Sequence, residues 1–206
     1  MAYSDFTLYD LEEKFGIISQ RKRLFNTVEP VDNISDWLKY NIELAEELPV
    51  KSEKAKSELI VMPILVELRK NNLKYFTIYS GDSLNIDERL KGECDFILSK
   101  ETGSAEINTP IMQVVEAKRN DVEVGISQCA AQMVGAKKFN EKKNKNQNTV
   151  YGCVTTGDDW LFLKLTDKII IDTKKYYLGN LPELLGVFQV IISEFKQEEI
   201  ENRCEL

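Results

Sequence analysis

Two carboxylates and a lysine stand where predicted core strands meet polar sequence. The segment VVEAKRND (114–121) passes from two β-branched residues directly into Glu116 and Lys118. Side chains two positions apart on a strand point to the same face. One strand earlier, Asp95 interrupts the apolar run CDFIL. Because a buried carboxylate is costly without a compensating partner, these three side chains require an explanation.

A divalent cation is one partner that would compensate them. Mg²⁺ prefers oxygen ligands and is commonly held by one or two carboxylates plus water. Asp95 and Glu116 on adjacent strands would supply such ligands, and Lys118 would hold a water or stabilise charge developing at phosphorus. This set of groups is suited to metal-assisted phosphodiester hydrolysis. The simpler alternative is a Glu116–Lys118 salt bridge at the end of a strand.

The Glu-x-Lys spacing has meaning here only through its position. The same spacing occurs at Glu12–Lys14, Glu141–Lys143 and Glu194–Lys196, which fall in predicted helices or near a loop. Only Glu116–Lys118 lies at the end of a predicted strand. Position, and not the dipeptide pattern, therefore singles out this pair.

Composition limits the chemistry that the chain can perform. The 206 residues include no histidine, which excludes Ser-His and Cys-His nucleophile pairs. The four cysteines show no paired spacing of a zinc site and suit a reducing compartment; they are Cys94, Cys129, Cys153 and Cys204. Catalysis must therefore rely on carboxylates, lysines or a bound metal.

Local patterns predict the elements that position these groups. Helices are predicted at 8–15, 36–48, 52–68, 124–139 and 182–199, with Thr7 just before the first, Gly16 as its end, Ser35 as the N-cap of the second and a kink at Pro63. Strands are predicted at 73–80, 93–100, 111–118, 149–156, 160–165 and 168–177. This order predicts an α/β protein with one mixed sheet between helices. The helix at 124–139 is the expected crossover between two parallel strands.

The ordered set of residues resembles the PD-(D/E)XK nuclease superfamily, which has the restriction-endonuclease-like fold. The matching positions are Glu58 on the first core helix, Asp95, the Glu116–Lys118 pair, and Gln128 in SQCAAQM on the following helix. The resemblance covers about residues 52–156. It implies an αβββαβ core in a single domain at 51–206, preceded by a helical extension at 1–50.

The resemblance also implies a role for each matching residue. Asp95, Glu116 and the carbonyl group of Ala117 would bind Mg²⁺ or Mn²⁺, with Glu58 as an auxiliary carboxylate. Lys118 would be the catalytic lysine, and Gln128 would orient either the substrate or the lysine. The sequence departs from the family at Cys94, where a proline usually precedes the aspartate.

The expected function is hydrolysis of nucleic acid, with DNA as the expected substrate. A net charge of −7 predicts weak DNA binding by the chain alone and leaves room for a protein partner or a homodimer. The basic residues expected around the site are Lys91, Arg119, Lys137 and Lys138. Two alternatives remain open: an inactive or regulatory binding module with the same fold, and a hydrolase of a small phosphoester.

The sequence also predicts a cytoplasmic protein that does not associate with a membrane. Its longest apolar run, LIVMPILV, is far shorter than the roughly 20 residues that span a bilayer. The acidic start of the chain lacks the basic segment and apolar core of a signal peptide.

Overall fold

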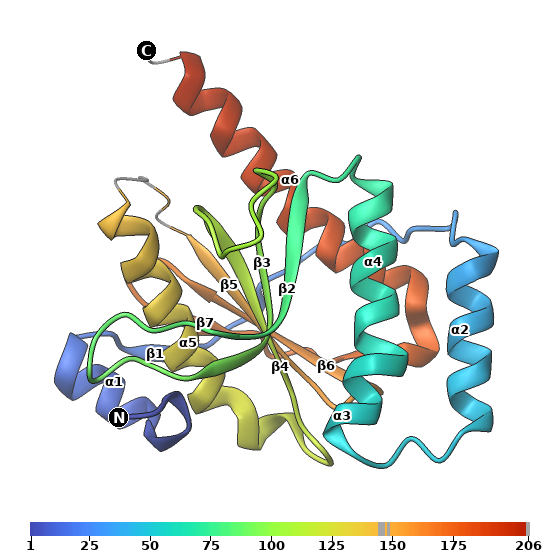
Figure 1. Cartoon of the computed structure of the whole chain (residues 1–206), viewed down its shortest axis with the longest axis horizontal. Helices are drawn as coiled ribbons and strands as arrows, with labels where there is room; N and C mark the ends of the chain where they lie inside the picture. The colour runs from blue at the N-terminus through green and yellow to red at the C-terminus, as the bar shows by residue number, and fades with distance from the viewer. Residues whose placement is uncertain (144–146, 148, 205–206) are drawn as a thin grey trace.

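A mixed sheet of eight strands forms the middle layer of the computed structural model (Figure 1), which describes residues 1–143, 147 and 149–204. The strand order is β1-β7-β6-β5-β4-β3-β2, and β8 pairs with β6. The strands are β1 (Ser19–Arg21), β2 (Phe76–Ser83), β3 (Glu93–Lys100), β4 (Ile111–Ala117), β5 (Val150–Thr155), β6 (Asp159–Leu165), β7 (Ile169–Ile171) and β8 (Tyr176–Tyr177).

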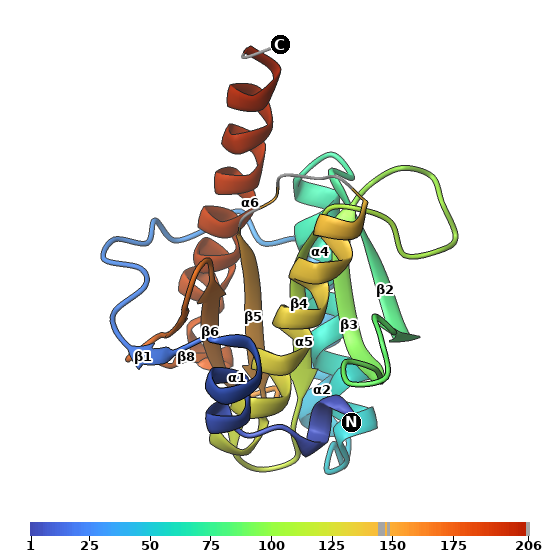
Figure 2. The same ribbon diagram turned by 90° about the vertical axis from the view of Figure 1, so that its left-hand side faces the viewer.

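Helices cover both faces of the sheet. They are η1 (Tyr3–Asp5), α1 (Leu8–Phe15), α2 (Asp36–Glu47), α3 (Glu53–Lys56), η2 (Ser57–Val61), α4 (Met62–Asn71), α5 (Val122–Lys142), η3 (Leu178–Asn180) and α6 (Leu181–Cys204). One core cluster joins the sheet to η1, α1 and α5, and the other joins it to α2, α4 and α6. The C-terminal half of α6 projects from the body (Figures 1 and 2). Within the described residues, no helix has the length and apolar character needed to cross a membrane.

The strands that carry the candidate site form the predicted arrangement. β2, β3 and β4 are an antiparallel meander, and α5 then leads to β5, which pairs with β4 in parallel. The prediction of a mixed sheet with 124–139 as its crossover helix is therefore confirmed. β4 is buried along its whole length, which explains why its sequence is mainly apolar, with Gln113 and Glu116 as the exceptions.

The predicted N-cap at Ser35 and helix end at Gly16 are confirmed, and Thr7 caps the first helix. The Thr7 hydroxyl accepts a hydrogen bond from Asp10 N at 3.1 Å, and the Ser35 hydroxyl accepts one from Leu38 N at 3.3 Å. Gly16 ends α1 with φ of 69°, a left-handed conformation that suits glycine. Pro63 lies just after the π-helical turn η2, which separates α3 from α4. The irregularity expected from Pro63 thus takes the form of a widened turn.

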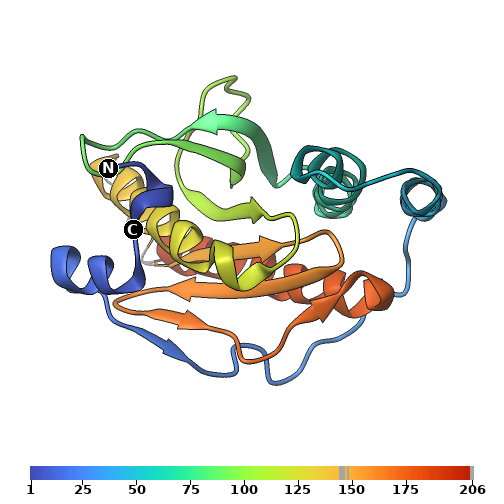
Figure 3. The ribbon, with the colours of Figure 1, turned by 90° about the horizontal axis from the view of Figure 1, so that it is seen from below.

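Two features near the sheet edge differ from the sequence expectation. β1 was not expected; it pairs in parallel with β7, and Figure 3 shows this blue strand lying beside the orange strands of the C-terminal half. The single strand predicted at 168–177 is divided into β7 and β8 around buried Asp172. The Asp172 carboxylate accepts hydrogen bonds from Leu24 N and Lys174 N, so it holds the chain in a bend.

The cysteines are consistent with a chain that uses no disulfide among its described thiols. Cys94, Cys129 and Cys153 are free and buried. The side chain of Cys204 lies outside the described part of the structure.

Candidate active site

Asp95 and Glu116 lie on neighbouring antiparallel strands, as predicted. The regular pairing of β3 with β4 reaches Phe96 opposite Val115. One residue further along, the Asp95 carboxylate accepts a hydrogen bond from Ala117 N at 2.6 Å. Continued by one residue, this register places Asp95 opposite Glu116, and burial, followed by repulsion from Asp95, raises the pKa of Glu116.

The Lys118 side chain forms a salt bridge with Glu116, the more buried carboxylate of this pair. Its Nζ donates to Glu116 Oε1 at 2.7 Å and to Gln128 Oε1 at 3.0 Å. The side chains of Lys118 and Glu116 are only 16% and 4% exposed, so water screens their interaction weakly. The structure therefore brings Glu116, Lys118 and Gln128 together between the end of β4 and helix α5.

Gln132 is a fourth member of this group that the sequence interpretation did not include. Its Nε2 donates to Glu116 Oε2 at 2.7 Å, and its Oε1 is buried without a partner among the described residues. Gln132 lies four positions after Gln128, which places both amides on one face of α5. That spacing was the signal in the sequence that could have identified it.

Electrostatics at the site favour an additional positive charge. Burial, followed by repulsion from Asp95, raises the pKa of Glu116 to about 7, although Lys118 and Gln132 donate hydrogen bonds to it. Burial also raises the pKa of Asp95, and the nearby carboxylates of Glu53 and Glu93 act in the same direction. The positive charge of Lys118 therefore neutralises only part of the negative charge of these carboxylates.

Lys118 keeps its proton in this environment. Burial alone lowers the pKa of its ammonium group, but the hydrogen bond to Glu116 and the neighbouring carboxylates outweigh burial and raise the pKa. A lysine with a raised pKa is a cationic hydrogen-bond donor at neutral pH and not a base. The geometry therefore suits Lys118 to stabilise negative charge.

The carboxylate that reaches the site from the first core helix is Glu53. Glu53 Oε1 accepts a hydrogen bond from Arg119 N at 3.1 Å, and its charge acts on both Asp95 and Lys118. Glu58 instead lies in η2, where its side chain is 62% exposed and 3.9 Å from Lys54. The structure records no contact between Glu58 and the predicted site residues. No pattern in the sequence distinguishes Glu53 from an ordinary acid in the first turn of a helix.

Of the four basic residues expected around the site, only Arg119 borders it. Lys137 Nζ donates to the carbonyl group of Thr166, and Lys138 Nζ lies 4.4 Å from the centre of the Phe15 ring. Lys91 is exposed just before β3, where its backbone bridges Ala2. Lys137 and Lys138 are therefore held by contacts away from the site, and among the described residues no hydrogen bond or ion pair joins Lys91 to it.

The donor set suits a metal that keeps much of its water. Among the described residues, no group of three or more His, Cys, Asp or Glu side chains is arranged to enclose an ion. Asp95 and Glu116 provide two carboxylates, and Asp95 Oδ1 has no hydrogen-bond partner in the described part of the chain. Mg²⁺ is commonly held by so few protein ligands, so these residues fit it better than they fit zinc.

Comparison with known proteins adds no relative. No family model matches the chain, and its sequence has no significant match among curated proteins.

Proposed function

We propose that this protein is a Mg²⁺- or Mn²⁺-dependent nuclease of the PD-(D/E)XK type, with a restriction-endonuclease-like fold and DNA as its substrate. The observation that carries the proposal is the Asp95–Glu116 pair on adjacent strands with the Lys118 ammonium bound to Glu116 and Gln128. A plain salt bridge explains the Glu116–Lys118 contact. It does not explain why a second acidic residue, Asp95, lies on the neighbouring strand, where its charge raises the pKa of the buried Glu116.

Asp95, Glu116 and the main-chain carbonyl group of Ala117 would hold the metal in this proposal. When bound, the ion supplies a polarised phosphoryl oxygen and a water of lowered pKa. Glu53 takes the auxiliary position that the sequence suggested for Glu58, because its charge reaches Asp95 and Lys118. In the net reaction, a water oxygen bonds to phosphorus, the bond to the leaving oxygen breaks, and that oxygen receives a proton.

Lys118 would stabilise the charge that develops on the phosphoryl oxygens. Its contacts with Glu116 and Gln128 hold the ammonium group in place before substrate binds. Preorganised donors of this kind typically contribute about 10² to 10³ in rate. Gln128 would orient Lys118, and Gln132 would orient Glu116, so both glutamines are positioning residues.

Metal binding and cleavage together test the proposal. A ligand that binds only the folded state at a hundredfold excess over Kd stabilises by about 2.7 kcal/mol, so Mg²⁺ or Mn²⁺ should raise the melting temperature of the wild type. Asp95→Asn should lose this response and raise the metal-free melting temperature, because it removes one repelling charge. Lys118→Met should keep the metal response and lose about 10² to 10³ in cleavage rate.

Lys164→Met is the matched control for Lys118→Met. Lys164 Nζ also pairs with a glutamate, Glu194, at 2.6 Å and is partly buried, but it makes no hydrogen bond or ion pair with a site residue. The control should retain cleavage after any loss of stability is taken into account. Metal binding by the wild type without cleavage of single- or double-stranded DNA or RNA at low salt would contradict the nuclease proposal. That result would favour a binding module with the same fold.

A further inference from the structure

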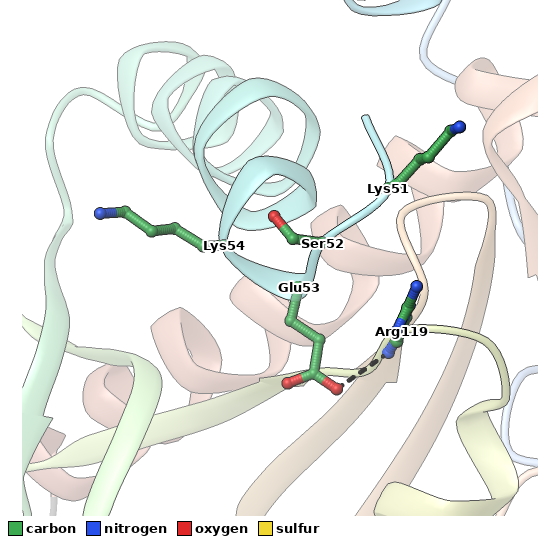
Figure 4. A pocket seen from close by; sticks show the side chains of 5 residues that line it. All are labelled: Lys51, Ser52, Glu53, Lys54 and Arg119. Carbon is green, nitrogen blue, oxygen red and sulfur yellow. Dashed lines mark hydrogen bonds between the residues drawn. The ribbon is translucent and has the colours of Figure 1, made fainter. Parts of the chain in front are cut away.

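A hollow of about 450 Å³ opens beside the candidate site. It is lined by Lys51, Ser52, Glu53, Lys54 and Arg119, which come from the start of α3 and from the residue after Lys118 (Figure 4). Arg119 and Lys51 lie on the same side of α3, whereas Lys54 extends to its other side. The hollow therefore joins the end of β4 to the first core helix.

The backbone of Arg119 is fixed on both sides by α3. Its N–H donates to Glu53 Oε1 at 3.1 Å, and its carbonyl group accepts a hydrogen bond from Lys56 Nζ at 2.8 Å. Glu53 and Lys56 thus hold the peptide groups on either side of one loop residue. The guanidinium group takes part in neither contact and remains at the hollow.

In the part of the chain that the structure describes, two basic side chains at the hollow are unpaired, whereas other basic side chains near the site are paired. Lys118 is bound to Glu116 and Gln128, while Arg21 and Lys175 pair with Glu123. Within the described residues, neither the Arg119 guanidinium nor the Lys51 ammonium has a hydrogen-bond or ion-pair partner. Lys54 extends away from the other two cations and lies 3.9 Å from Glu58, so Arg119 and Lys51 against Glu53 leave a local balance of +1 in a chain whose net charge is −7.

We propose that this hollow binds a phosphate group of the nucleic-acid strand adjacent to the phosphate that is cleaved. Arg119 makes the direct contact, Lys51 adds charge, and Glu53 and Lys56 are positioning residues for Arg119. This inference rests on the proposed nuclease function. The guanidinium fork matches phosphate geometry, and the hydrogen bonds to the backbone of Arg119 fix the point from which its side chain extends.

The spacing of the chain is compatible with neighbouring phosphates. Consecutive Cα atoms lie about 3.8 Å apart. Neighbouring phosphates of a strand lie farther apart than their axial rise of about 3.4 Å, because the strand winds around the helix axis, and the long side chains of two adjacent residues can cover that separation. If the cleaved phosphate lies at Lys118, the next phosphate along the strand falls within reach of the side chain of Arg119.

Binding of chemically altered DNA tests the contact. Affinity for a short duplex is measured by fluorescence anisotropy over a range of salt concentrations, with Ca²⁺ in place of Mg²⁺, and cleavage is measured separately. Arg119→Gln should weaken binding roughly tenfold to a hundredfold and reduce the salt slope by about 0.9. Lys70→Gln removes the same charge from an exposed position near the end of α4 and should change neither quantity.

Single neutral methylphosphonates then locate the phosphate. In the wild type, one position next to the cleavage site should weaken binding as much as Arg119→Gln does. In Arg119→Gln, the same methylphosphonate should have no further effect, because the contact is already absent. Lys56→Met should reduce the sensitivity to that position, and Lys56→Arg should restore it, since arginine can still donate to the carbonyl group of Arg119.

The outcomes separate this inference from the proposed function. Equal affinity and salt slope for Arg119→Gln and Lys70→Gln would overturn the phosphate site even if the wild type cleaves DNA. An Arg119-dependent methylphosphonate position without cleavage would keep the phosphate site and reject the nuclease. Failure of the wild type to bind nucleic acid at low salt would overturn the site. A site that takes only free phosphate would also overturn the proposal. In that case inorganic phosphate would compete with DNA at constant ionic strength, and no methylphosphonate position would weaken binding.

Discussion

The Glu116 carboxylate lies in surroundings that favour its protonated form. It is 3% exposed, and its two oxygens face Lys118 on one side and Gln132 on the other. Burial and repulsion from Asp95 together exceed the stabilisation that these two donors provide, which raises the pKa of Glu116 to about 7. The same imbalance that raises the pKa would favour the binding of a cation.

This raised pKa predicts that the metal-free protein loses stability as the pH rises. The folded state binds the Glu116 proton more tightly than the unfolded state, in which the pKa is about 4.3. The resulting stabilisation is fully present below that value and is lost as pH rises through about 7. The free energy of unfolding in EDTA should therefore fall between about pH 5 and pH 8. One pKa unit corresponds to about 1.4 kcal/mol, so the loss is at most roughly 3 kcal/mol.

Glu116→Gln should remove most of this pH dependence and stabilise the metal-free protein at pH 8. The new amide can still accept from Lys118, and its NH₂ group can donate to Gln132 Oε1, which has no partner in the wild type, once the Gln132 amide turns over. Urea unfolding at several pH values measures the effect. An equally steep pH dependence in Glu116→Gln would show that other groups cause it.

Sequence alone could identify the residues of the site that lie on strands. Asp95 and Glu116–Lys118 were recognisable because a charge at the end of an apolar strand is unusual and strand geometry fixes the face on which it lies. The helix acid was not recognisable, because Glu53 and Glu58 both lie near the start of an apolar helical run. Only the position of Arg119 in the folded chain selects Glu53.

The same difference between local and distant interactions decides which elements could be predicted. The caps at Thr7, Ser35 and Gly16 depend on residues a few positions away, so local sequence specifies them. β1 has the sequence SQR and becomes a strand only by pairing with β7, which is about 150 residues later. Its existence depends on the completed fold, so no local pattern could predict it.

Helix α5 packs closely against the sheet at Gly125, and this contact carries a prediction at the scale of the element. A Cβ atom at Gly125 would lie 2.5 Å from Val154 Cγ1 on β5 and 3.0 Å from Lys118 Cγ. Gly125→Ala should therefore move α5 or displace Lys118. Overpacking typically costs about 1 to 3 kcal/mol, which the better helix propensity of alanine offsets only in part.

Urea unfolding and cleavage assays would measure both effects of Gly125→Ala. The cleavage rate should fall more than the loss of folded protein explains, because the alanine methyl group displaces the lysine stem. Gly179→Ala in η3 is the matched control, since a Cβ atom there meets no atom within 4 Å. Unchanged cleavage in a folded Gly125→Ala protein would show that the position of Lys118 tolerates this displacement.

The first 50 residues are integrated into the whole molecule more closely than a helical extension requires. They supply β1 to the sheet and side chains to both core clusters, including Tyr3 and Leu11 on one face and Phe25 and Leu38 on the other. The buried carboxylate of Glu67 on α4 accepts hydrogen bonds from Ser35 N at 2.9 Å and Ser35 Oγ at 2.7 Å, which ties the start of α2 to α4. These contacts predict that residues 1–50 unfold together with the rest of the chain.

The two tryptophans can test this cooperativity because they report on different parts of the molecule. Trp37 lies on α2 and is 46% exposed, whereas Trp160 on β6 is completely buried and its indole N–H donates to the carbonyl group of Gly157. In Trp160→Phe, fluorescence follows α2 alone; in Trp37→Phe, it follows the sheet. Within each variant, the urea midpoint from fluorescence should coincide with the midpoint from far-ultraviolet circular dichroism.

Trp160→Phe should lower both midpoints, since it removes buried volume and a hydrogen bond, whereas Trp37→Phe should change them little. A Trp37 signal that changes at lower urea than the circular dichroism of the same variant would show that α2 detaches first. Residues 1–50 would then be an appendage, and their contribution to both core clusters would not make them part of one cooperative unit.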